Sequence, residues 1–242
     1  MKQQIFKVQI EFDRNTVNFE INQQIKQRQK GYVCVCDGAV FARANRDEDY
    51  CNILNGAFIN VCDGFSIAMF ASLIYKKKYA TYHGPELFEY FTKQNYSQVF
   101  LGNTDEVLKQ LKRKFADKDY NINKMHFIPL PFNPVNGFNY SKIGNLINNY
   151  NPQIVWVSLG APKQEMFISK LMPYIDNCLV IAIGAAFSLF IDTGYYKRAP
   201  SWIRSIGFEW LFRIFLEPKR FLRALNYIAI LPKMIISEIY TR

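Results

Sequence analysis

Short apolar runs alternate with amphipathic stretches along most of the chain. Runs rich in β-branched or aromatic residues predict strands at residues 32–36, 58–62, 99–101, 126–130, 154–159 and 179–183. Helical periodicity predicts helices at residues 65–75, 85–93, 104–115, 140–149 and 164–174. Strands that are apolar throughout and alternate with helices are typical of parallel sheets buried on both faces. The pattern therefore predicts an α/β fold with a mostly parallel sheet and helices on both of its faces.

The pattern changes at both ends of the chain. Near the amino terminus, residues 6–12 alternate between apolar and polar side chains, which predicts one half-buried strand. Towards the carboxyl terminus, strand signals stop from Ser201 onwards. We therefore predict two parts, an α/β body of residues 1–195 and a helical C-terminal appendage of residues 196–242.

The appendage is predicted to contain two main helices, at residues 202–216 and 219–231, with Pro218 at a helix start. Pro232 predicts an interruption before a last short helix at residues 234–240. The second helix has an apolar face made of Phe221, Leu222, Leu225, Ile228 and Ala229. Such a face beside arginines fits packing against the body or lying on a bilayer surface, and the sequence leaves both open.

The charge of the chain is strongly basic and unevenly distributed. Lys and Arg number 30 against 20 Asp and Glu, which gives a net charge of +10 and an isoelectric point near 9.3. The appendage holds nine basic and three acidic side chains, so more than half of the net charge lies there. A basic balance indicates an anionic partner, such as nucleic acid, a phosphorylated substrate or lipid headgroups. We expect that partner to meet the appendage.

Compartment signals indicate the cytoplasm. The apolar, uncharged stretch at residues 178–191 has only 14 residues, whereas spanning a bilayer needs about 18 or more. The first residues lack the apolar core of a signal peptide because Lys7, Gln9 and Glu11 interrupt them. Five cysteines form an odd set without framework spacing, which favours a reducing compartment and buried thiols. Cys34 and Cys36 are therefore interpreted as core residues rather than as metal ligands.

Two carboxylates follow neighbouring predicted strands. Asp63-Gly64 comes directly after the strand at residues 58–62, and Asp37-Gly38 after the strand at residues 32–36. Ligands of parallel α/β sheets bind at the carboxyl ends of the strands, where a carboxylate acts as a general base or binds a hydroxyl group. The alternative is that each aspartate caps a helix or closes a turn. If the strands are neighbours in the sheet, both acids face one site.

A second candidate region joins the strand at residues 154–159 to the next helix. Its sequence runs Gly160-Ala161-Pro162-Lys163-Gln164-Glu165. Glycine permits close approach of a ligand, and the N–H groups at the start of a helix bind phosphate. Gln164 and Glu165 are candidates for hydrogen bonds to sugar hydroxyls, and Lys163 for contact with the donor. The alternative is an ordinary turn with polar residues in the first helical turn.

Basic residues of the appendage form a third group of candidates. Lys197 and Arg198 open it, and Arg213, Arg220 and Arg223 follow on the predicted helices. Guanidinium groups match phosphate oxygens geometrically, so a diphosphate is a suitable target. The alternative is a solvated helix face.

Other familiar motifs are absent or weak. No Gly-x-Gly-x-x-Gly and no phosphate-binding Gly-rich loop occurs, which argues against a dinucleotide-binding dehydrogenase or a P-loop enzyme. Residues 47–49 and 117–119 both have Asp-x-Asp spacing, which sugar-nucleotide enzymes use to hold a divalent cation. Neither follows a strand directly, so we interpret them as a helix start and a solvated run.

An ordered set of motifs resembles the WecG/TagA/CpsF glycosyltransferases. The set comprises Leu54-Asn55, Asp63-Gly64, Gly84-Pro85-Glu86-Leu87-Phe88, residues 160–165, residues 197–200, residues 207–213 and residues 217–220. It extends from about Gly31 to Asn226, four-fifths of the chain. Each motif is modest alone, but their order and spacing are specific.

The resemblance implies a Rossmann-like body and an inverting, metal-independent hexosyltransferase without a cofactor. It implies transfer of N-acetylmannosamine or another hexose from a UDP-sugar to a polyprenyl-diphosphate-linked acceptor. The resemblance places this transfer reaction at the cytoplasmic face of the cell membrane, with the appendage on the membrane surface. The resemblance assigns Asp63 as catalytic base, Gln164 to the pocket, and Arg213, Arg220 and Arg223 to the completion of the site. It leaves a homo-oligomer open.

Several positions depart from the family pattern. Val35-Cys36-Asp37 stands where the family has Thr-Pro-Asn, and Thr81 where it has a pocket arginine. Residues 76–78 or His83 are candidates to replace that arginine. Ser188 lies in a changed segment after the last strand. These changes bear on the identity of the sugar more than on the type of reaction.

Two other functions remain open at this stage. One is a catalytically impaired relative that acts as an assembly partner. The other is a basic α/β module that binds nucleic acid, although no nucleic-acid-binding motif occurs and we expect no such partner.

Overall fold

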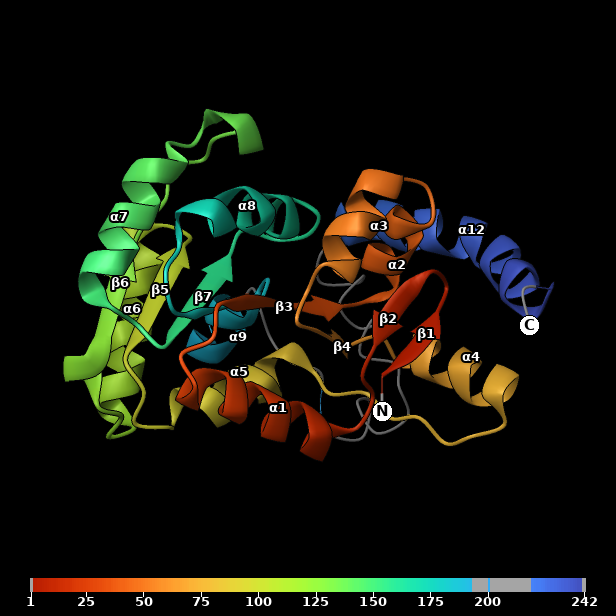
Figure 1. Cartoon of the computed structure of the whole chain (residues 1–242), viewed down its shortest axis with the longest axis horizontal. Coiled ribbons are helices and arrows are strands. Elements are labelled where there is room, and N and C mark those ends of the chain that lie inside the picture. Colours follow the sequence, from red (N-terminus) through yellow and green to blue (C-terminus); the bar gives the residue numbers. More distant parts are fainter. Residues whose placement is uncertain (1, 193–199, 201–218, 241–242) are drawn as a thin grey trace.

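The protein was analysed as a computed structural model that describes residues 2–192, 200 and 219–240. Its centre is a six-stranded parallel sheet in the order β4-β3-β8-β7-β5-β6 (Figure 1). The strands are β3 (Gly31–Cys36), β4 (Ile59–Cys62), β5 (Gln98–Gly102), β6 (Met125–Ile128), β7 (Ile154–Ser158) and β8 (Leu179–Ala182). The six strands predicted from apolar runs are confirmed.

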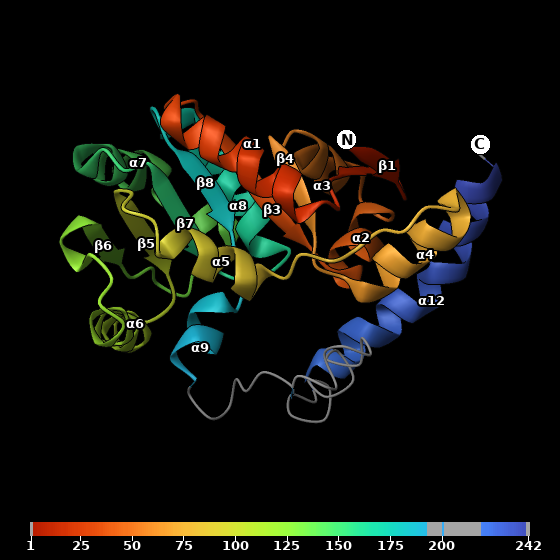
Figure 2. The same cartoon turned by 90° about the horizontal axis from the view of Figure 1, so that it is seen from below.

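Helices cover both faces of this sheet, as predicted (Figure 2). One face packs against α1 (Arg14–Lys26), α5 (Gly84–Thr92), α6 (Asp105–Asp117) and α9 (Ala186–Ile191). The other packs against α2 (Gly38–Ala44), α3 (Glu48–Asn55), α4 (Phe65–Tyr75), α7 (Tyr140–Tyr150), α8 (Lys163–Leu171) and α12 (Lys219–Tyr240). Short 3₁₀ turns lie at Ile122–Lys124, Val135–Gly137 and Met172–Tyr174. The fold is thus α/β and Rossmann-like.

The single strand predicted for residues 6–12 is wrong. The chain forms an antiparallel hairpin of β1 (Gln3–Ile5) and β2 (Val8–Ile10). Phe6 and Lys7 have left-handed φ values of 48° and 69°, and these values reverse the chain within two residues. From Phe6 to Ile10, across the turn and β2, buried and exposed side chains still alternate, so the pattern does not reveal the turn.

Pro232 does not interrupt the last helix, contrary to the prediction. α12 continues through it from Lys219 to Tyr240. Ile230 and Met234, on either side of the proline, are buried against the body, with 8% and 2% of their surfaces exposed. These tertiary contacts hold both turns in place despite the lost backbone hydrogen bond.

The apolar face predicted for this helix points outward. Leu222, Leu225 and Ile228 are 66%, 44% and 50% exposed. The helix instead packs on the body through Tyr227, Ile230 and Met234. The predicted helix at residues 202–216 and the predicted boundary at residue 195 lie outside the described residues. Within the described part of the chain, no helix has the length and apolarity needed to cross a bilayer.

Candidate active site

Asp37 and Asp63 lie at the carboxyl ends of two adjacent strands, as predicted. Cys36 of β3 pairs with Cys62 of β4, and the Asp63 N–H donates to the Cys36 carbonyl at 3.0 Å. The two following loops are in close contact, because a Cβ added at Gly64 would lie 3.2 Å from the Gly38 nitrogen. Glycine at position 64 therefore permits the approach of the two loops.

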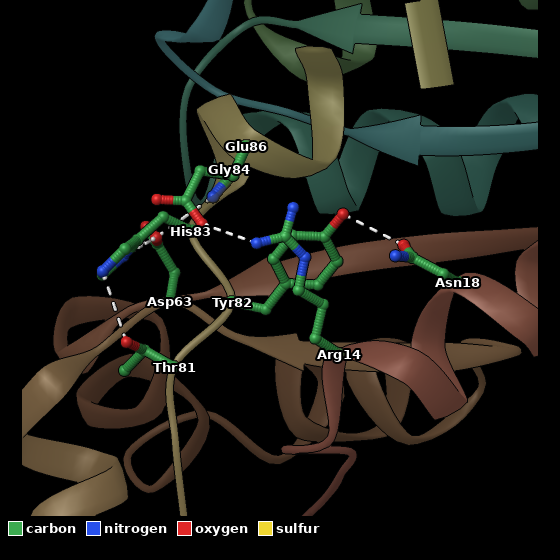
Figure 3. A network of polar contacts seen from close by, with 8 residues as sticks. All are labelled: Arg14, Asn18, Asp63, Thr81, Tyr82, His83, Gly84 and Glu86. Carbon is green, nitrogen blue, oxygen red and sulfur yellow. Dashed lines mark hydrogen bonds and ion pairs between the residues drawn. The ribbon is translucent and has the colours of Figure 1, made fainter. Parts of the chain in front are cut away.

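The two aspartates have different local roles. Asp37 caps α2, where its Oδ1 accepts from the Val40 N–H at 3.0 Å. Asp63 does not cap the helix that follows it, since Gly64 occupies the N-cap of α4 without a side-chain bond. The Oδ1 of Asp63 instead accepts from His83 Nδ1 at 3.0 Å and from the Gly84 N–H at 3.2 Å (Figure 3). Asp37 thus caps the helix that follows it, whereas Asp63 bonds to the first N–H of α5 instead of capping α4.

The segment that carries His83 is anchored by Tyr82. Only 1% of Tyr82 is exposed, its N–H donates to the Cys62 carbonyl at 2.8 Å, and its hydroxyl donates to Asn18 Oδ1 at 3.0 Å. Burial raises the pKa of Tyr82 to about 12, so the hydroxyl stays protonated as a donor. Figure 3 shows Tyr82 directed towards α1 and Thr81 and His83 gathered at Asp63.

Arg14 of α1 covers this anchor from outside. Its guanidinium carbon lies 4.7 Å from the centre of the Tyr82 ring, and its Nη1 lies 3.5 Å from Glu86 Oε2 (Figure 3). A cation over an aromatic ring and an ion pair to α5 tie the segment to the helices on both sides. His83 is consequently presented to Asp63 from a supported segment.

The loop before α8 has the geometry of a close-approach turn. Gly160 adopts a left-handed φ of 74°, and no atom lies within 4 Å of a Cβ added there. Lys163 begins α8, and its Nζ lies 4.8 Å from the centre of the Phe132 ring and 5.3 Å from that of Phe138. Phe132 is fully exposed. The α8 end of the site therefore presents a glycine, an ammonium group and an accessible aromatic ring.

Gln164 and Glu165 point into the protein rather than towards solvent. They are 2% and 0% exposed. Gln164 Oε1 accepts from the Gly184 N–H at 2.9 Å, and its Nε2 donates to Glu165 Oε1 at 2.8 Å. Tyr50 of α3 donates to Glu165 Oε2 at 3.1 Å. The expected contact of Glu165 with a substrate is not what this geometry provides: Glu165 holds Gln164, and Gln164 joins α8 to the end of β8.

Burial dominates the electrostatics of Glu165. Loss of solvation raises the pKa of its carboxyl to about 7, although the hydrogen bonds from Gln164 and Tyr50 act in the opposite direction. Burial also raises the pKa of Tyr50, with the Glu165 charge as the next cause. The pair therefore forms a buried polar joint between α3 and α8 whose charge changes near neutrality.

The beginning of α12 lies against the same end of the sheet. A Cβ added at Gly38 would lie 2.9 Å from the Tyr227 ring, and the Tyr227 hydroxyl lies 2.8 Å from Ser66 Oγ. Burial raises the pKa of Tyr227 to about 12. Tyr227 thus contacts the first turns of α2 and α4, the helices that follow Asp37 and Asp63.

The remaining basic candidates are only partly placed. Arg220 and Arg223 belong to the first two turns of α12, but their own side chains are outside the described part. Lys197, Arg198 and Arg213 lie outside the described residues altogether. Position along α12 puts Arg223 one turn before Tyr227.

The Asp-x-Asp candidates have structural roles in the described chain. Asp47 caps α3 through the Tyr50 N–H at 3.1 Å and pairs with Arg43 at 2.6 Å. Asp117 ends α6, and Asp119 takes a left-handed φ of 57° in the turn that follows. The described residues contain no group of three or more His, Cys, Asp or Glu side chains able to hold a metal ion. All five cysteines are free and buried, which confirms the interpretation of Cys34 and Cys36 as core thiols.

Comparison with known proteins identifies the family. The model of the glycosyl transferase WecG/TagA/CpsF family matches residues 3–242. The chain belongs to this family. One relative is the N-acetylglucosaminyldiphosphoundecaprenol N-acetyl-beta-D-mannosaminyltransferase of Bacillus subtilis (strain 168), 26% identical over 224 residues. The match covers 87% of this chain and 84% of that protein.

Within this glycosyltransferase, sequence reasoning underestimated two residues. His83 was considered only as a replacement for an arginine, yet it directly contacts Asp63. Tyr227 was not singled out, yet it docks α12 beside the site. The position of His83 directly before the Gly84 motif could have indicated a role at the site. Nothing in the sequence, by contrast, pairs Tyr227 with Gly38.

Proposed function

We propose that this protein transfers a hexose from a UDP-sugar to a sugar carried on polyprenyl diphosphate, with inversion at the anomeric carbon. Membership of the family and the acceptor named for the Bacillus subtilis relative support this reading. One observation carries it: the Asp63 side chain is 29% exposed at the carboxyl end of β4 and is fixed there by two donors. That is the arrangement a general base requires.

The reaction is a single displacement. The acceptor hydroxyl oxygen attacks the anomeric carbon while its proton passes to the Asp63 carboxylate. The bond from the anomeric carbon to the diphosphate oxygen breaks, and its electron pair leaves with UDP. Asp37, Gly64 and Gly160 line the carboxyl edge of the sheet, where backbone and carboxylate groups bind the donor.

Cationic groups stabilise the departing diphosphate. Lys163 and the first N–H groups of α8 contribute to this, together with the basic residues of the appendage, Lys197, Arg198, Arg213, Arg220 and Arg223. This set provides the positive charge that a divalent metal supplies in other transferases. Gln164 and Glu165 keep the beginning of α8 in register with β8.

The outward face of α12 suits a membrane-borne acceptor. Five apolar side chains lie exposed along it, at Leu222, Leu225, Ile228, Ile236 and Ile239. A helix that is apolar on its outer side and lies in a strongly basic segment binds at the surface of anionic bilayers. We place the protein peripherally on the cytoplasmic face of the cell membrane.

Asp63→Asn tests the proposed function. With UDP-N-acetylmannosamine and a synthetic polyprenyl-diphosphate N-acetylglucosamine acceptor, transfer should fall by about 100-fold or more, because the amide cannot accept the proton. Binding of UDP, followed by calorimetry, should persist. Asp119→Asn is the matched control, since Asp119 is exposed and asparagine tolerates its left-handed φ.

Two outcomes would contradict the proposal. Undiminished transfer by Asp63→Asn would refute the base assignment. Activity that disappears with a chelator and returns with Mn²⁺ would refute the metal-independent mechanism. A UDP-release assay separates an active enzyme from a catalytically impaired relative.

A further inference from the structure

Thr81, His83 and Asp63 form a short chain of hydrogen bonds at the carboxyl end of β4 (Figure 3). We propose that His83 is a positioning residue for Asp63: its imidazole donates the Nδ1–H to the carboxylate and holds it ready for the acceptor hydroxyl. The inference rests on the proposed function, because it concerns the base of that reaction. It assigns a role to a residue that the mechanism above does not use.

The contacts select one tautomer of the ring. An ionised carboxylate only accepts hydrogen bonds, so the His83 Nδ1, at 3.0 Å from Asp63 Oδ1, carries the hydrogen. In a neutral imidazole the Nε2 then has a lone pair and accepts from the Thr81 hydroxyl, which lies 3.3 Å away. A ring with its hydrogen on Nδ1 therefore satisfies both contacts.

Two donors converge on one oxygen of Asp63. Besides His83, the Gly84 N–H reaches the same Oδ1 at 3.2 Å. Together they fix the rotation of the carboxylate and stabilise its ionised form. The Gly84 N–H is a backbone donor, so it is present with any residue at position 83. A substitution of His83 therefore removes only the hydrogen bond from the imidazole.

The location of His83 is compatible with a role at the reacting site. The side chains of His83 and Asp63 are 26% and 29% exposed, so neither is sealed in the core. The segment is nevertheless held firmly by the buried Tyr82 between its two polar neighbours. A partly exposed side chain on an anchored backbone is suited to orient a catalytic group.

Two amide substitutions divide the functions of the two ring nitrogens. The amide nitrogen of asparagine reaches approximately the place of Nδ1, and that of glutamine the place of Nε2. We expect His83→Ala and His83→Gln to lower kcat by about 10- to 100-fold, a range typical for loss of an orienting partner, with the donor KM changed less than about twofold. His83→Asn should retain kcat within about fivefold of the unmodified protein, and Thr81→Val should lower kcat less than His83→Ala.

The same experiment separates failure of this inference from failure of the proposed function. If Asp63→Asn remains active, the proposed function fails. If Asp63→Asn is inactive and His83→Ala is fully active, only the role of His83 fails. If His83→Asn is as impaired as His83→Ala, donation from Nδ1 is refuted; activity of His83→Gln alone would instead identify Nε2 as the important atom.

A spectroscopic readout tests the tautomer independently of activity. The chain contains only two histidines, His83 and His126, so ¹⁵N resonances of the rings can be assigned with a His126→Gln variant. We expect the His83 ring to carry a hydrogen on Nδ1 that is bonded to Asp63, and we expect loss of this signature in Asp63→Asn. A His83 ring protonated only at Nε2 would overturn the proposal.

Discussion

At the scale of single residues, the carboxyl edge of the sheet contains two carboxylates with opposite surroundings. Asp63 is partly exposed and receives hydrogen bonds from a neighbouring loop. Glu165 is completely buried and is bonded by two side chains. The first arrangement suits proton transfer to a ligand, and the second couples protonation to the stability of the fold.

Glu165 should make stability depend on pH. Burial raises the pKa of its carboxyl from an ordinary value of 4.5 to about 7, so the native state binds the proton more tightly than the unfolded state. The proton on Glu165 therefore contributes fully to the free energy of unfolding below about pH 4.5, and this contribution is lost as the pH rises through 7. Glu165→Gln mimics the protonated carboxyl, and it should become more stable relative to the unmodified protein between pH 5 and pH 8, by up to a few kcal/mol.

Urea unfolding at pH 5 and pH 8 measures this effect. Glu106→Gln is the control, because Glu106 is exposed on α6. Its free energy of unfolding should differ from that of the unmodified protein by the same amount at both pH values. A stability difference for Glu165→Gln that does not change with pH would show that Glu165 does not titrate in this window.

The sequence predicted some of these residues and not their partners. Asp37 and Asp63 could be placed together because they follow consecutive strands, and consecutive strands are commonly neighbours in a sheet. Glu165 resembled a polar residue of a first helical turn because its partner Tyr50 lies 115 positions earlier. His83 is 20 positions from Asp63, and only the path of the chain after α4 brings them together.

At the scale of elements, the regular strands could be predicted and the polar or irregular segments could not. β4, β5, β7 and β8 are buried along their whole length, so they are visible as apolar runs. α1 escaped prediction because its apolar stripe is narrow, comprising Val17, Ile21 and Ile25 on an otherwise polar helix. Its start is nevertheless marked, since Asp13 caps it by accepting from the Thr16 N–H at 2.7 Å.

The outer face of α12 should bind membranes without contributing to folding. Leu225→Ser with Ile228→Ser removes two exposed apolar side chains, so the free energy of unfolding should change by less than about 1 kcal/mol. Binding to vesicles that contain phosphatidylglycerol should weaken by about tenfold, because less apolar surface enters the interface. Co-sedimentation with these vesicles measures the binding of the double variant and of the unmodified protein.

Phe19→Ser with Leu146→Ser is the matched control for this prediction. Both side chains are exposed, on α1 and α7 rather than on α12 (Figure 1). Equal loss of vesicle binding in the control would assign the interaction to general surface hydrophobicity instead of to α12.

At the scale of the whole molecule, α12 contacts α2 and α4, the two helices that follow Asp37 and Asp63. Figure 2 shows α12 running beside α4. Tyr227 contacts Gly38 of α2 and Ser66 of α4, and Tyr75 of α4 donates a short hydrogen bond to Glu238 near the end of α12. In the proposed mechanism, the position of α12 would therefore set where Arg220 and Arg223 stand relative to Asp63.

Gly38→Ala tests this link because the new Cβ would lie 2.9 Å from two carbons of the Tyr227 ring. Gly38 has no left-handed φ, so alanine is compatible with the backbone and the strain falls on the contact with α12. We expect kcat/KM for the lipid-linked acceptor to fall by about tenfold, as misplaced cations stabilise the departing diphosphate less well.

A second substitution shows whether the contact is responsible. Tyr227→Leu shortens the side chain, so Gly38→Ala combined with Tyr227→Leu should recover activity to at least the level of Tyr227→Leu alone. Additive losses in the double variant would mean that Gly38→Ala acts on Asp37 and the start of α2 rather than through α12. Recovery would show instead that the packing of one helix against a glycine sets the distance between the predicted cationic groups and the carboxylate that accepts the proton.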